Sequence, residues 1–260
     1  MTLHLKTSTK TDKGLVRTNN EDAFFSCDLV DENESDPSIG HLYVVADGMG
    51  GVAAGEIASQ LATEAMADFY SNKKDTTDGH DLQERLAGAV MQANDSILDY
   101  VKQNPKTLGM GTTLTAILFH GDEAILAHVG DSRVYLLRDG DLYQVSKDHS
   151  EVQFMVDMGR LTPEEARNHP RKHILTQAVG VENSNFLDIF TRRLSVLPDD
   201  VFMMCSDGLT DMLSDDDILD LMMQKSEPDG IAQSLIDAAL KEGGRDNVTV
   251  IIIRVMDNDA

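Results

Sequence analysis

The stretch Val44-Val-Ala-Asp-Gly-Met-Gly-Gly51 carries an apolar run directly into an aspartate and then into a group of glycines. The residues that lead into it, His41–Ala46, are rich in β-formers, which predicts a strand. After it, apolar side chains recur every four residues between Ala53 and Tyr70, which predicts a helix with one buried face. The glycines let the chain turn from the strand into the helix. The stretch therefore predicts a strand that presents Asp47 where the chain turns.

The same mixture of strands and helices continues along the chain. Short runs rich in β-branched and aromatic residues predict strands at Thr112–Phe119, Glu123–Val129, Arg133–Leu137, Val201–Cys205 and Val248–Val255. Helical periodicity predicts helices at Leu82–Val101, Ile218–Met223 and Ile231–Leu240. The turns His120-Gly-Asp122 and Arg138-Asp-Gly-Asp141 predict hairpins, and hairpins build antiparallel sheets. We therefore expect an α+β fold, a layered sandwich of antiparallel sheets and helical hairpins.

One segment is less regular than the rest. Residues 150–185 contain Pro163, Pro170 and Gly180, which interrupt regular structure. We interpret this segment as a flap that carries a short helix near Glu151–Met158. No repeat and no linker-like stretch divides the chain, so we expect one domain over residues 1–260, with the flap as part of it.

Composition describes an ordinary globular chain. Its 260 residues are 41% hydrophobic, enough to bury a sizeable core. The longest apolar runs are much shorter than the roughly 20 residues that cross a bilayer, and the first residues lack the apolar stretch of a signal peptide. The two cysteines, Cys27 and Cys205, form no disulfide framework. We therefore expect a cytoplasmic protein, and a monomer by default.

The charge balance excludes one class of partner. The chain carries 45 acidic and 22 basic residues, a formal net charge of −23. Phosphate backbones bind to an excess of Lys and Arg, so this balance argues against nucleic acid as a partner. It argues equally against an anionic membrane surface. Most of the acidic excess serves solubility, but part of it lies where solvation is no explanation.

That part consists of acidic residues at the ends of predicted strands. Asp47, Asp131 and Asp207 each follow an apolar run, and each is next to a glycine. Asp246 precedes the last strand, and the pair Glu21-Asp22 opens an early one. A single Asp-Gly marks only a turn. Because strands of a compact fold end on common faces, several such carboxylates in one chain are expected to converge.

Convergent carboxylates repel one another strongly unless cations lie between them. All-oxygen ligands suit Mg²⁺ and Mn²⁺, and Gly48 would let a backbone carbonyl approach such an ion. Two ions about 3.5–4 Å apart, bridged by one carboxylate, would activate a water and neutralise a phosphoryl group. No group of Cys and His residues has the sequence spacing of a zinc site. His169 and His173 are four apart, but their Pro- and Arg-rich surroundings argue against a metal site.

One basic residue fits a phosphate-handling site. Arg17 precedes the acidic pair Glu21-Asp22 by four residues. A guanidinium beside a metal centre can hold two phosphate oxygens in a bidentate fork, which Lys does less well. An isolated Arg is usually a surface residue, and the spacing to the acidic pair is what favours a role in phosphate binding.

These motifs follow one another in a fixed order: Arg17-Thr-Asn-Asn-Glu-Asp-Ala23, Val45-Ala-Asp-Gly-Met-Gly-Gly51, Gly109-Met-Gly-Thr-Thr113, Val129-Gly-Asp-Ser-Arg133, Cys205-Ser-Asp-Gly-Leu209 and Arg245-Asp-Asn-Val-Thr249. Their order resembles that of the metal-dependent protein phosphatase family (PPM, type 2C) in its bacterial serine/threonine phosphatase branch. Each motif alone is weak, but the ordered set is highly specific. The resemblance implies a four-layer αββα sandwich with metal ions at one edge of the two sheets.

The resemblance also implies roles for single residues. Asp47 matches the carboxylate that bridges two metal ions, and the Gly48 carbonyl matches a ligand of the second ion. Glu21 or Asp22 matches the acidic partner of that second ion, with Asp22 favoured as the direct ligand. Thr113 matches a motif residue that supports the site structurally.

The remaining roles belong to residues further along the chain. Asp207 and Asp246 match ligands of the first ion, and Arg17 matches the phosphate-binding arginine. Asp131, with Asp207 or Asp211, matches a weaker third metal site. Arg17, Asp47 and Asp207 are thus the expected catalytic residues, with two core Mn²⁺ or Mg²⁺ ions and a possible third.

The implied function is hydrolysis of phosphoserine and phosphothreonine in proteins that a serine/threonine kinase has modified. Some family members carry a His, proposed as the general acid, at the position of Met49, so the proton donor is unassigned here. One alternative is a catalytically inactive relative that binds phosphoproteins. Another is an aspartyl-phosphate mechanism, but the aspartates at 47 and 207 lack the second Asp two residues later that such enzymes need.

Overall fold

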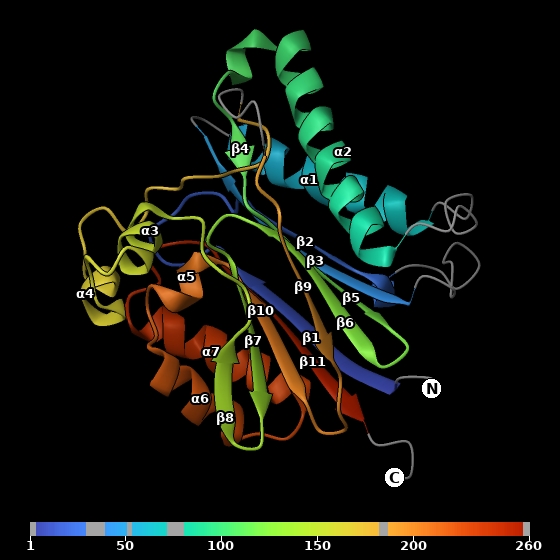
Figure 1. The fold of residues 1–260 in the computed structure, drawn as a ribbon. Helices are drawn as coiled ribbons and strands as arrows, with labels where there is room; N and C mark the ends of the chain where they lie inside the picture. The colour runs from blue at the N-terminus through green and yellow to red at the C-terminus, as the bar shows by residue number, and fades with distance from the viewer. Residues whose placement is uncertain (1–3, 30–39, 51–53, 72–80, 182–186, 257–260) are drawn as a thin grey trace.

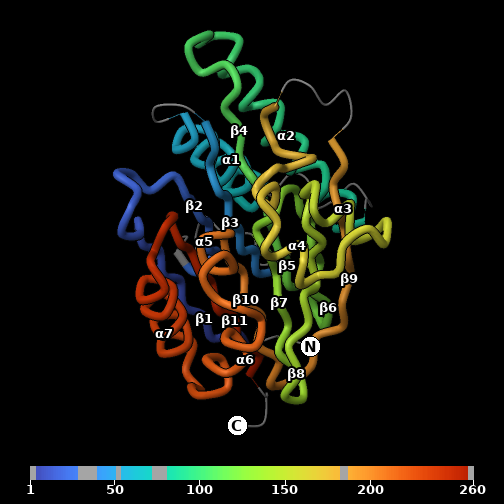
Figure 2. The backbone as a smooth tube through the Cα atoms, turned by 90° about the vertical axis from the view of Figure 1, so that its left-hand side faces the viewer, coloured from blue at the N-terminus to red at the C-terminus, as the bar shows by residue number. Residues whose placement is uncertain are grey.

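The chain folds into two antiparallel β-sheets that pack face to face, with helices on both outer sides (Figures 1 and 2). The computed structural model describes residues 4–29, 40–50, 54–71, 81–181 and 187–256. The αββα sandwich expected from the sequence is confirmed. Among the helices in these ranges, none is both long enough and apolar enough to span a bilayer.

One sheet has six strands, in the order β2-β3-β5-β6-β9, with β4 paired to β3. Its strands are β2 (Asp22–Ser26), β3 (His41–Met49), β4 (Gly111–Thr112), β5 (Leu114–His120), β6 (Glu123–Val129) and β9 (Phe190–Ser195). Its outer face is covered by the helices α1 (Ala54–Ser71) and α2 (Leu82–Gln103), which pack on each other. These helices lie at the top of the view in Figure 2.

The second sheet has five strands, in the order β1-β11-β10-β7-β8. Its strands are β1 (His4–Asp12), β7 (Arg133–Arg138), β8 (Asp141–Gln144), β10 (Val201–Cys205) and β11 (Val248–Met256). Its outer face is covered by the helices α6 (Asp215–Met223) and α7 (Pro228–Lys241), and a short helix, α5 (Asp207–Thr210), follows β10 directly. The two sheets therefore each carry their own helical layer.

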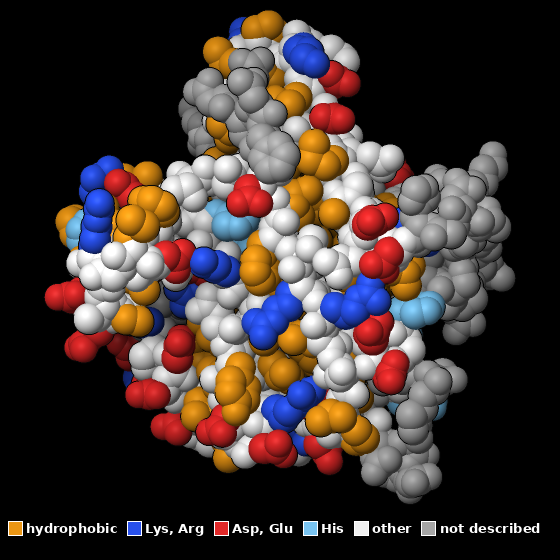
Figure 3. Space-filling view, viewed as in Figure 1, with side chains coloured by type: hydrophobic (Ala, Val, Ile, Leu, Met, Phe, Trp, Pro, Cys, Tyr) orange, Lys and Arg blue, Asp and Glu red, His pale blue; other side chains and the backbone are white. Residues whose placement is uncertain are grey.

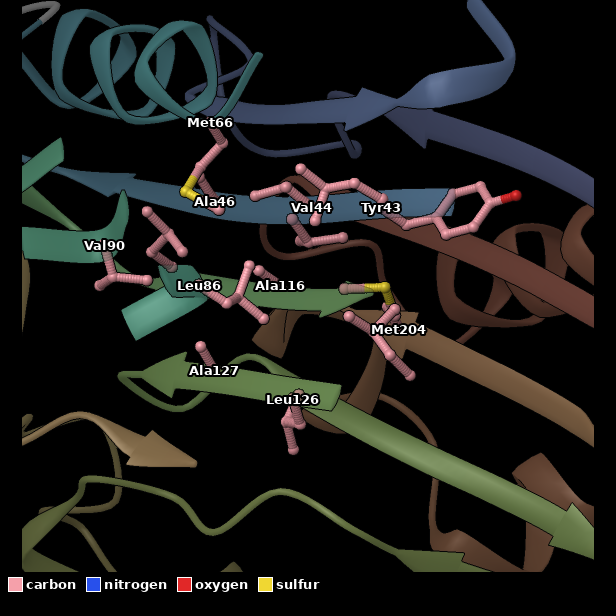
Figure 4. Packing of buried hydrophobic residues seen from close by; sticks show 14 of the residues in the cluster. Tyr43, Val44, Ala46, Met66, Leu86, Val90, Ala116, Leu126, Ala127 and Met204 are labelled. Atoms are coloured by element: carbon pink, nitrogen blue, oxygen red, sulfur yellow. The ribbon is translucent and has the colours of Figure 1, made fainter. Parts of the chain in front are cut away.

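The central strands are apolar on both faces because both faces are buried. On β11, Ile251 and Ile253 face the core between the sheets, while Val250 and Ile252 face the helical layer. This alternation follows from the two-residue period of a strand. Figure 4 shows Met66 of α1, Leu86 of α2 and Met204 of β10 within the larger core. A sheet buried on both sides holds the strand ends in fixed positions.

The flap carries two short helices, α3 (Glu151–Asp157) and α4 (Pro163–Arg167). The helix expected near Glu151–Met158 is confirmed, with Ser150 as its N-cap. Residues 182–185 of the expected flap lie outside the described part. Two contacts close the flap into a loop. Ser150 and Leu175 form a strand bridge, and the Thr176 N–H donates to the His149 carbonyl at 2.8 Å.

Three strands were not expected from the sequence, and all three are at sheet edges. β1 and β8 end the five-stranded sheet, and β9 ends the six-stranded one. In edge strands, apolar and polar residues alternate less clearly because one edge of the strand meets solvent. Polar residues there also discourage pairing with other chains. The strand expected at Thr112–Phe119 is divided into β4 and β5, because Thr113 between them turns its backbone toward Asp47.

Candidate metal centre

The site begins where β2 and β3 pair, because this ladder sets Asp22 opposite Asp47. The backbone of Asp47 is held on both sides. Its N–H donates to the Thr113 hydroxyl at 2.9 Å, and its carbonyl accepts from the Thr113 N–H and the Thr112 hydroxyl, both at 2.9 Å. Asp47 is therefore within β3, two residues before its end, and not in a free turn.

Gly48 follows at a point of close backbone contact. Its N–H donates to the Glu21 carbonyl at 3.1 Å. A Cβ on Gly48 would lie 2.1 Å from the Gly55 carbonyl oxygen of α1 and 2.7 Å from that of Glu21. No side chain fits, so a glycine is required for β3 to pass between α1 and the chain before β2. The role expected for this glycine in letting backbone approach the site has a steric basis.

The five-stranded sheet supplies the other carboxylates. Asp207 is the first residue of α5, directly after β10, and Asp211 caps the end of the same helix. Asp246 lies two residues before β11. A Cβ on Gly208 would lie only 1.9 Å from the Asn247 carbonyl oxygen, so the glycine after Asp207 lets the two loops touch. Strands of both sheets thus deliver aspartates to one place.

These residues line one cavity of about 630 Å³. It contains eight of the nine residues predicted for the site: Arg17, Glu21, Asp47, Gly48, Asp131, Asp207, Asp211 and Asp246. The ninth, Asp22, is half-buried and is not among the residues that line the cavity. Its Oδ2 accepts from the hydroxyls of Ser206 and Thr249, each at 2.7 Å, and its Oδ1 has no partner among the described residues. Glu21 thus lines the cavity and Asp22 lies beside Asp47 on the paired strand; the expectation that favoured Asp22 as the direct ligand stays a prediction.

Asn247 organises the rim and was not singled out from the sequence. Its side-chain oxygen accepts from the Glu21 N–H at 2.8 Å, and its amide nitrogen donates to the carbonyls of Lys13 (2.9 Å) and Asn19 (2.8 Å). Its own N–H donates to Asp246 Oδ1 at 2.8 Å. The motif Arg245-Asp-Asn contained the residue, but only the aspartate suggested chemistry.

The carboxylates carry an electrostatic cost. Burial, and then the charges of Asp22, Asp207 and Asp131, raise the pKa of Asp47 well above its usual range. Burial and Asp207 act in the same way on the pKa of Asp131. Burial, opposed in part by its hydroxyl partners, raises the pKa of Asp22 to about 7. Each shift has the cause expected for like charges held in a site of low dielectric constant.

Two cationic side chains and a histidine lie against the carboxylates at the outer part of the site. Arg17 Nη2 lies 2.6 Å from Asp246 Oδ2. From the flap, Lys172 Nζ lies 2.7 Å from Asp211 Oδ1, and His173 Nδ1 lies 3.4 Å from Asp211 Oδ2. The sequence predicted no role for His173 beside these aspartates, but the flap brings it next to Asp207 and Asp211. No sequence signal connects the flap to these aspartates.

The donors present fit hard divalent cations. The inner donors are carboxylate oxygens, from Asp47, Asp131 and Asp246, and backbone oxygens of the same cavity. None of these donors is a thiol or an imidazole. Buried like charges and the unpartnered Asp22 oxygen are what a bound cation with its waters would relieve. Mg²⁺ and Mn²⁺ both prefer such ligands. The fold and the site thus define a class: an αββα sandwich with a carboxylate centre between its two sheets.

Comparison with known proteins narrows this class. The family model described as protein phosphatase 2C matches residues 16–241. The serine/threonine protein phosphatase PstP of Mycobacterium tuberculosis is 44% identical over 260 residues, which are 100% of this chain but 46% of that protein. The chain thus spans about half the length of this relative. The serine/threonine phosphatase stp of Listeria welshimeri is 34% identical over a match that covers 94% of this chain and 93% of that protein.

A solved structure agrees with both. The catalytic domain of PstP in complex with two manganese ions superimposes with a TM-score of 0.83 at 42% sequence identity, covering 98% of this chain and 100% of that chain. The chain therefore belongs to the protein phosphatase 2C family.

The raised pKa values predict how neutralising Asp47 changes stability. A carboxyl whose pKa is raised in the folded state lowers stability progressively as pH rises from its unfolded pKa, near 3.9, to its folded pKa, and the loss remains at higher pH. Without metal, Asp47→Asn should therefore gain stability over the wild type as pH rises from 5 to 7.5, by up to about 1.4 kcal/mol per pH unit. Urea unfolding in EDTA at pH 5 and at pH 7.5 measures this difference in unfolding free energy between Asp47→Asn and the wild type.

The mutant and the wild type share all their other titrating groups, so the contributions of these groups to pH dependence cancel in the difference. Such groups include His128 and His149, whose burial lowers their pKa. The matched control is Asp95→Asn, an exposed aspartate of α2; its difference from the wild type should not change with pH. A loss of stability in Asp47→Asn at both pH values would mean that the carboxylate is structural.

Proposed function

We propose that the chain is a protein phosphatase that hydrolyses phosphoserine and phosphothreonine by direct attack of water on phosphorus. The observation that carries this proposal is the convergence of five aspartates and Arg17 on one cavity. The names of the relatives support the same reaction. The oxygen of water bonds to phosphorus, the bond from phosphorus to the serine or threonine oxygen breaks, and that oxygen takes up a proton.

Two core ions, Mn²⁺ or Mg²⁺, are proposed to be held by the inner residues of the cavity. Asp47, on β3, is acted on by the charges of Asp22, Asp131, Asp207 and Asp246 and so suits the bridging role. Asp207 and Asp246 would complete one site, and the Gly48 carbonyl with Glu21 the other. We favour Glu21 there because it lines the cavity; Asp22, whose Oδ2 is bound by Ser206 and Thr249, would contribute through its Oδ1, which lacks a partner in the described part of the chain. When bound, such ions supply an activated water and neutralise phosphoryl charge.

The third ion is proposed to be weaker because side chains compete for its place. Asp131, Asp207 and Asp211 would form this site. Lys172 and His173 already lie against Asp211 and Asp207. A cation that binds there must displace the two flap cations, and the free energy of those contacts is subtracted from its affinity.

Arg17 is proposed to orient the phosphoryl group. Its guanidinium is half exposed at the cavity rim and engages Asp246 through Nη2. The Asp246 carboxylate and the charges of Glu21 and Asp47 raise the pKa of Arg17, so it is a permanent cation. It can therefore hold two phosphate oxygens in a fixed fork. Met49 offers no proton to the leaving oxygen, and the general acid is not assigned.

The flap is proposed to select the sequence around the phosphorylated residue. A second cavity of about 490 Å³ lies between the flap and α6, next to the first, and shares Asp131, Asp207 and Asp211 with it. Its rim includes Glu164, Asp215 and Asp216. Figure 3 shows acidic side chains gathered over α6 and β8, whereas basic ones lie over β9. This distribution favours peptides with basic residues near the phosphate.

The remaining proposals concern context. We propose that residues 1–260 form one phosphatase domain with a flap at about 150–185. We further propose that it acts as a monomer in the cytoplasm on proteins phosphorylated by a serine/threonine kinase. The charge of −23 supports the exclusion of nucleic acid and anionic membranes as partners.

Metal dependence is the first test. The chain should hydrolyse para-nitrophenyl phosphate with Mn²⁺ and lose that activity in EDTA, with recovery when Mn²⁺ is restored. Asp207→Asn should lose most of the activity and keep its fold, as judged by circular dichroism. Inactivity with both Mn²⁺ and Mg²⁺ would favour the alternative, a phosphoprotein-binding relative without catalysis. Acid-stable phosphorylation of the enzyme during turnover would instead favour a covalent aspartyl phosphate.

The role of Arg17 is tested by two substitutions. Arg17→Ala removes a charge-assisted bond worth about 1.5–3 kcal/mol, so kcat/KM should fall about 10- to 100-fold. Arg17→Lys keeps the charge without the fork and should recover only part of the loss. Unfolding free energies should hardly change because the side chain is half exposed. Full activity of Arg17→Lys would show that only charge matters.

The charge preference of the flap cavity is tested with matched phosphopeptides. At equal ionic strength, a phosphothreonine peptide flanked by Lys should be turned over about two- to fivefold faster than one flanked by Asp, which corresponds to a partly exposed ion pair. The double variant E164Q/D216N should reduce this ratio, whereas Asp95→Asn should leave it unchanged. Faster turnover of the acidic peptide would contradict the proposal.

A further inference from the structure

A second group of metal-binding side chains lies far from the carboxylate centre. Cys27 and Asp28 directly follow β2, and His41 opens β3. The Cys27 Sγ lies 3.8 Å from His41 Nδ1 and 3.8 Å from Asp28 Oδ1. One ligand atom from each of the three lies within 4.8 Å of the others. At the rise of a β-strand, His41 is about 20 Å from Asp47 along β3.

We propose that Cys27, Asp28 and His41 form a second metal site, which binds Zn²⁺ with solvent as the fourth ligand. In a tetrahedral zinc site with bonds of about 2.3 Å to sulfur and about 2.0 Å to nitrogen or oxygen, sulfur lies about 3.5 Å from the other ligands. The distances of 3.8 Å thus need to shorten only slightly. Cys27 is buried, His41 is half-buried and Asp28 is exposed, so the three ligands lie at the surface end of the β2–β3 pair.

The carboxylate of Asp28 is oriented by surrounding hydroxyls. Its Oδ2 accepts from the Thr7 hydroxyl at 2.5 Å and from the Ser26 hydroxyl at 3.2 Å. Its Oδ1 faces Cys27 and accepts from the Tyr43 hydroxyl at 3.5 Å. Within the described ranges no Lys or Arg forms an ion pair with Asp28. Fixed outer partners of this kind are typical of residues that hold a metal.

The donor chemistry selects a different cation from the first site. A thiolate and an imidazole favour Zn²⁺, whereas the carboxylate centre favours Mg²⁺ or Mn²⁺. Burial lowers the pKa of His41, which keeps the imidazole neutral and able to ligate. Burial and Asp28 raise the pKa of the Cys27 thiol, so the bound metal must displace a proton.

A metal here would lie beside a contact between the two sheets. Asp28 follows β2 of the six-stranded sheet, and its partner Thr7 lies on β1 of the five-stranded sheet. Both strands are at sheet edges, where fewer backbone bonds hold them. Binding to the folded state alone would raise the melting temperature. The site is thus proposed to be structural and independent of the phosphatase reaction.

Sequence spacing gave no sign of this site. The prediction that no Cys and His group has zinc spacing considered residues close along the chain, and His41 is 14 residues from Cys27. The β2–β3 pairing brings them together. This places the site outside the sequence patterns by which zinc sites are usually found.

The test uses the full chain, Co²⁺ as a spectroscopic substitute for Zn²⁺, and measured zinc content after dialysis. The wild type should retain one equivalent of Zn²⁺ and show a thiolate-to-cobalt charge-transfer band in the near ultraviolet. Cys27→Ser and His41→Gln should lose the band, and Cys205→Ser should keep it. Cys205 is the matched control because it is the other buried cysteine and is the last residue of β10, in the other sheet.

Two further measurements keep the result unambiguous. Zn²⁺ should raise the melting temperature of the wild type but not that of Cys27→Ser, whose fold is checked by circular dichroism and by Mn²⁺-dependent activity. Thr7→Val should weaken Zn²⁺ binding about 10- to 100-fold, as expected when an outer partner of a ligand is lost. Absence of the band in the wild type, or its persistence in Cys27→Ser, would overturn the proposal and leave the proposed phosphatase function untouched.

Discussion

Like-charged carboxylates held together in a buried site are the constraint on which the rest of this structure depends. Asp47 and Asp131 are half-buried at the cavity wall and repel each other, and both are repelled by Asp207, which with burial raises their pKa values. No single hairpin could hold such groups against their repulsion. The fold solves this by delivering them from different strands of two sheets, each of which is fixed by its own apolar core. The αββα layering thus determines where charge can be concentrated.

The contacts that position the aspartates also hold the sheets together. Asp22 belongs to β2 of one sheet, while Ser206 and Thr249, which donate to its carboxylate, lie at strand ends of the other. Asn247, beside β11, fixes the backbone of Glu21. The polar network at this edge is therefore part of the sheet packing itself. A substitution there affects site geometry and stability together, and this is why measurements at more than one pH are needed to separate them.

The sequence was sufficient for the central strands, the helices and most of the cavity residues, because each has a local signal. Buried strands are apolar runs, and the aspartates stand beside glycines whose steric need is real at Gly48 and Gly208. The sequence did not show which distant segments of the chain lie next to each other. The edge strands β1, β8 and β9 have a mixed pattern because solvent accepts polar residues there. Lys172, His173 and Asn247 act through contacts between segments distant in sequence, and nothing local marks them.

The β2–β3 ladder has a different chemical character at each end. At one end it carries Asp22 and Asp47, hard oxygen donors with like charge. At the other it carries Cys27 and His41, softer donors that face a single carboxylate. Because donor type and geometry help to decide which cation a site accepts, the two ends, about 20 Å apart along β3, differ in the metal that their donors favour. The short strand between them is rigid because β3 is buried on both faces, so occupation of one end changes the other little.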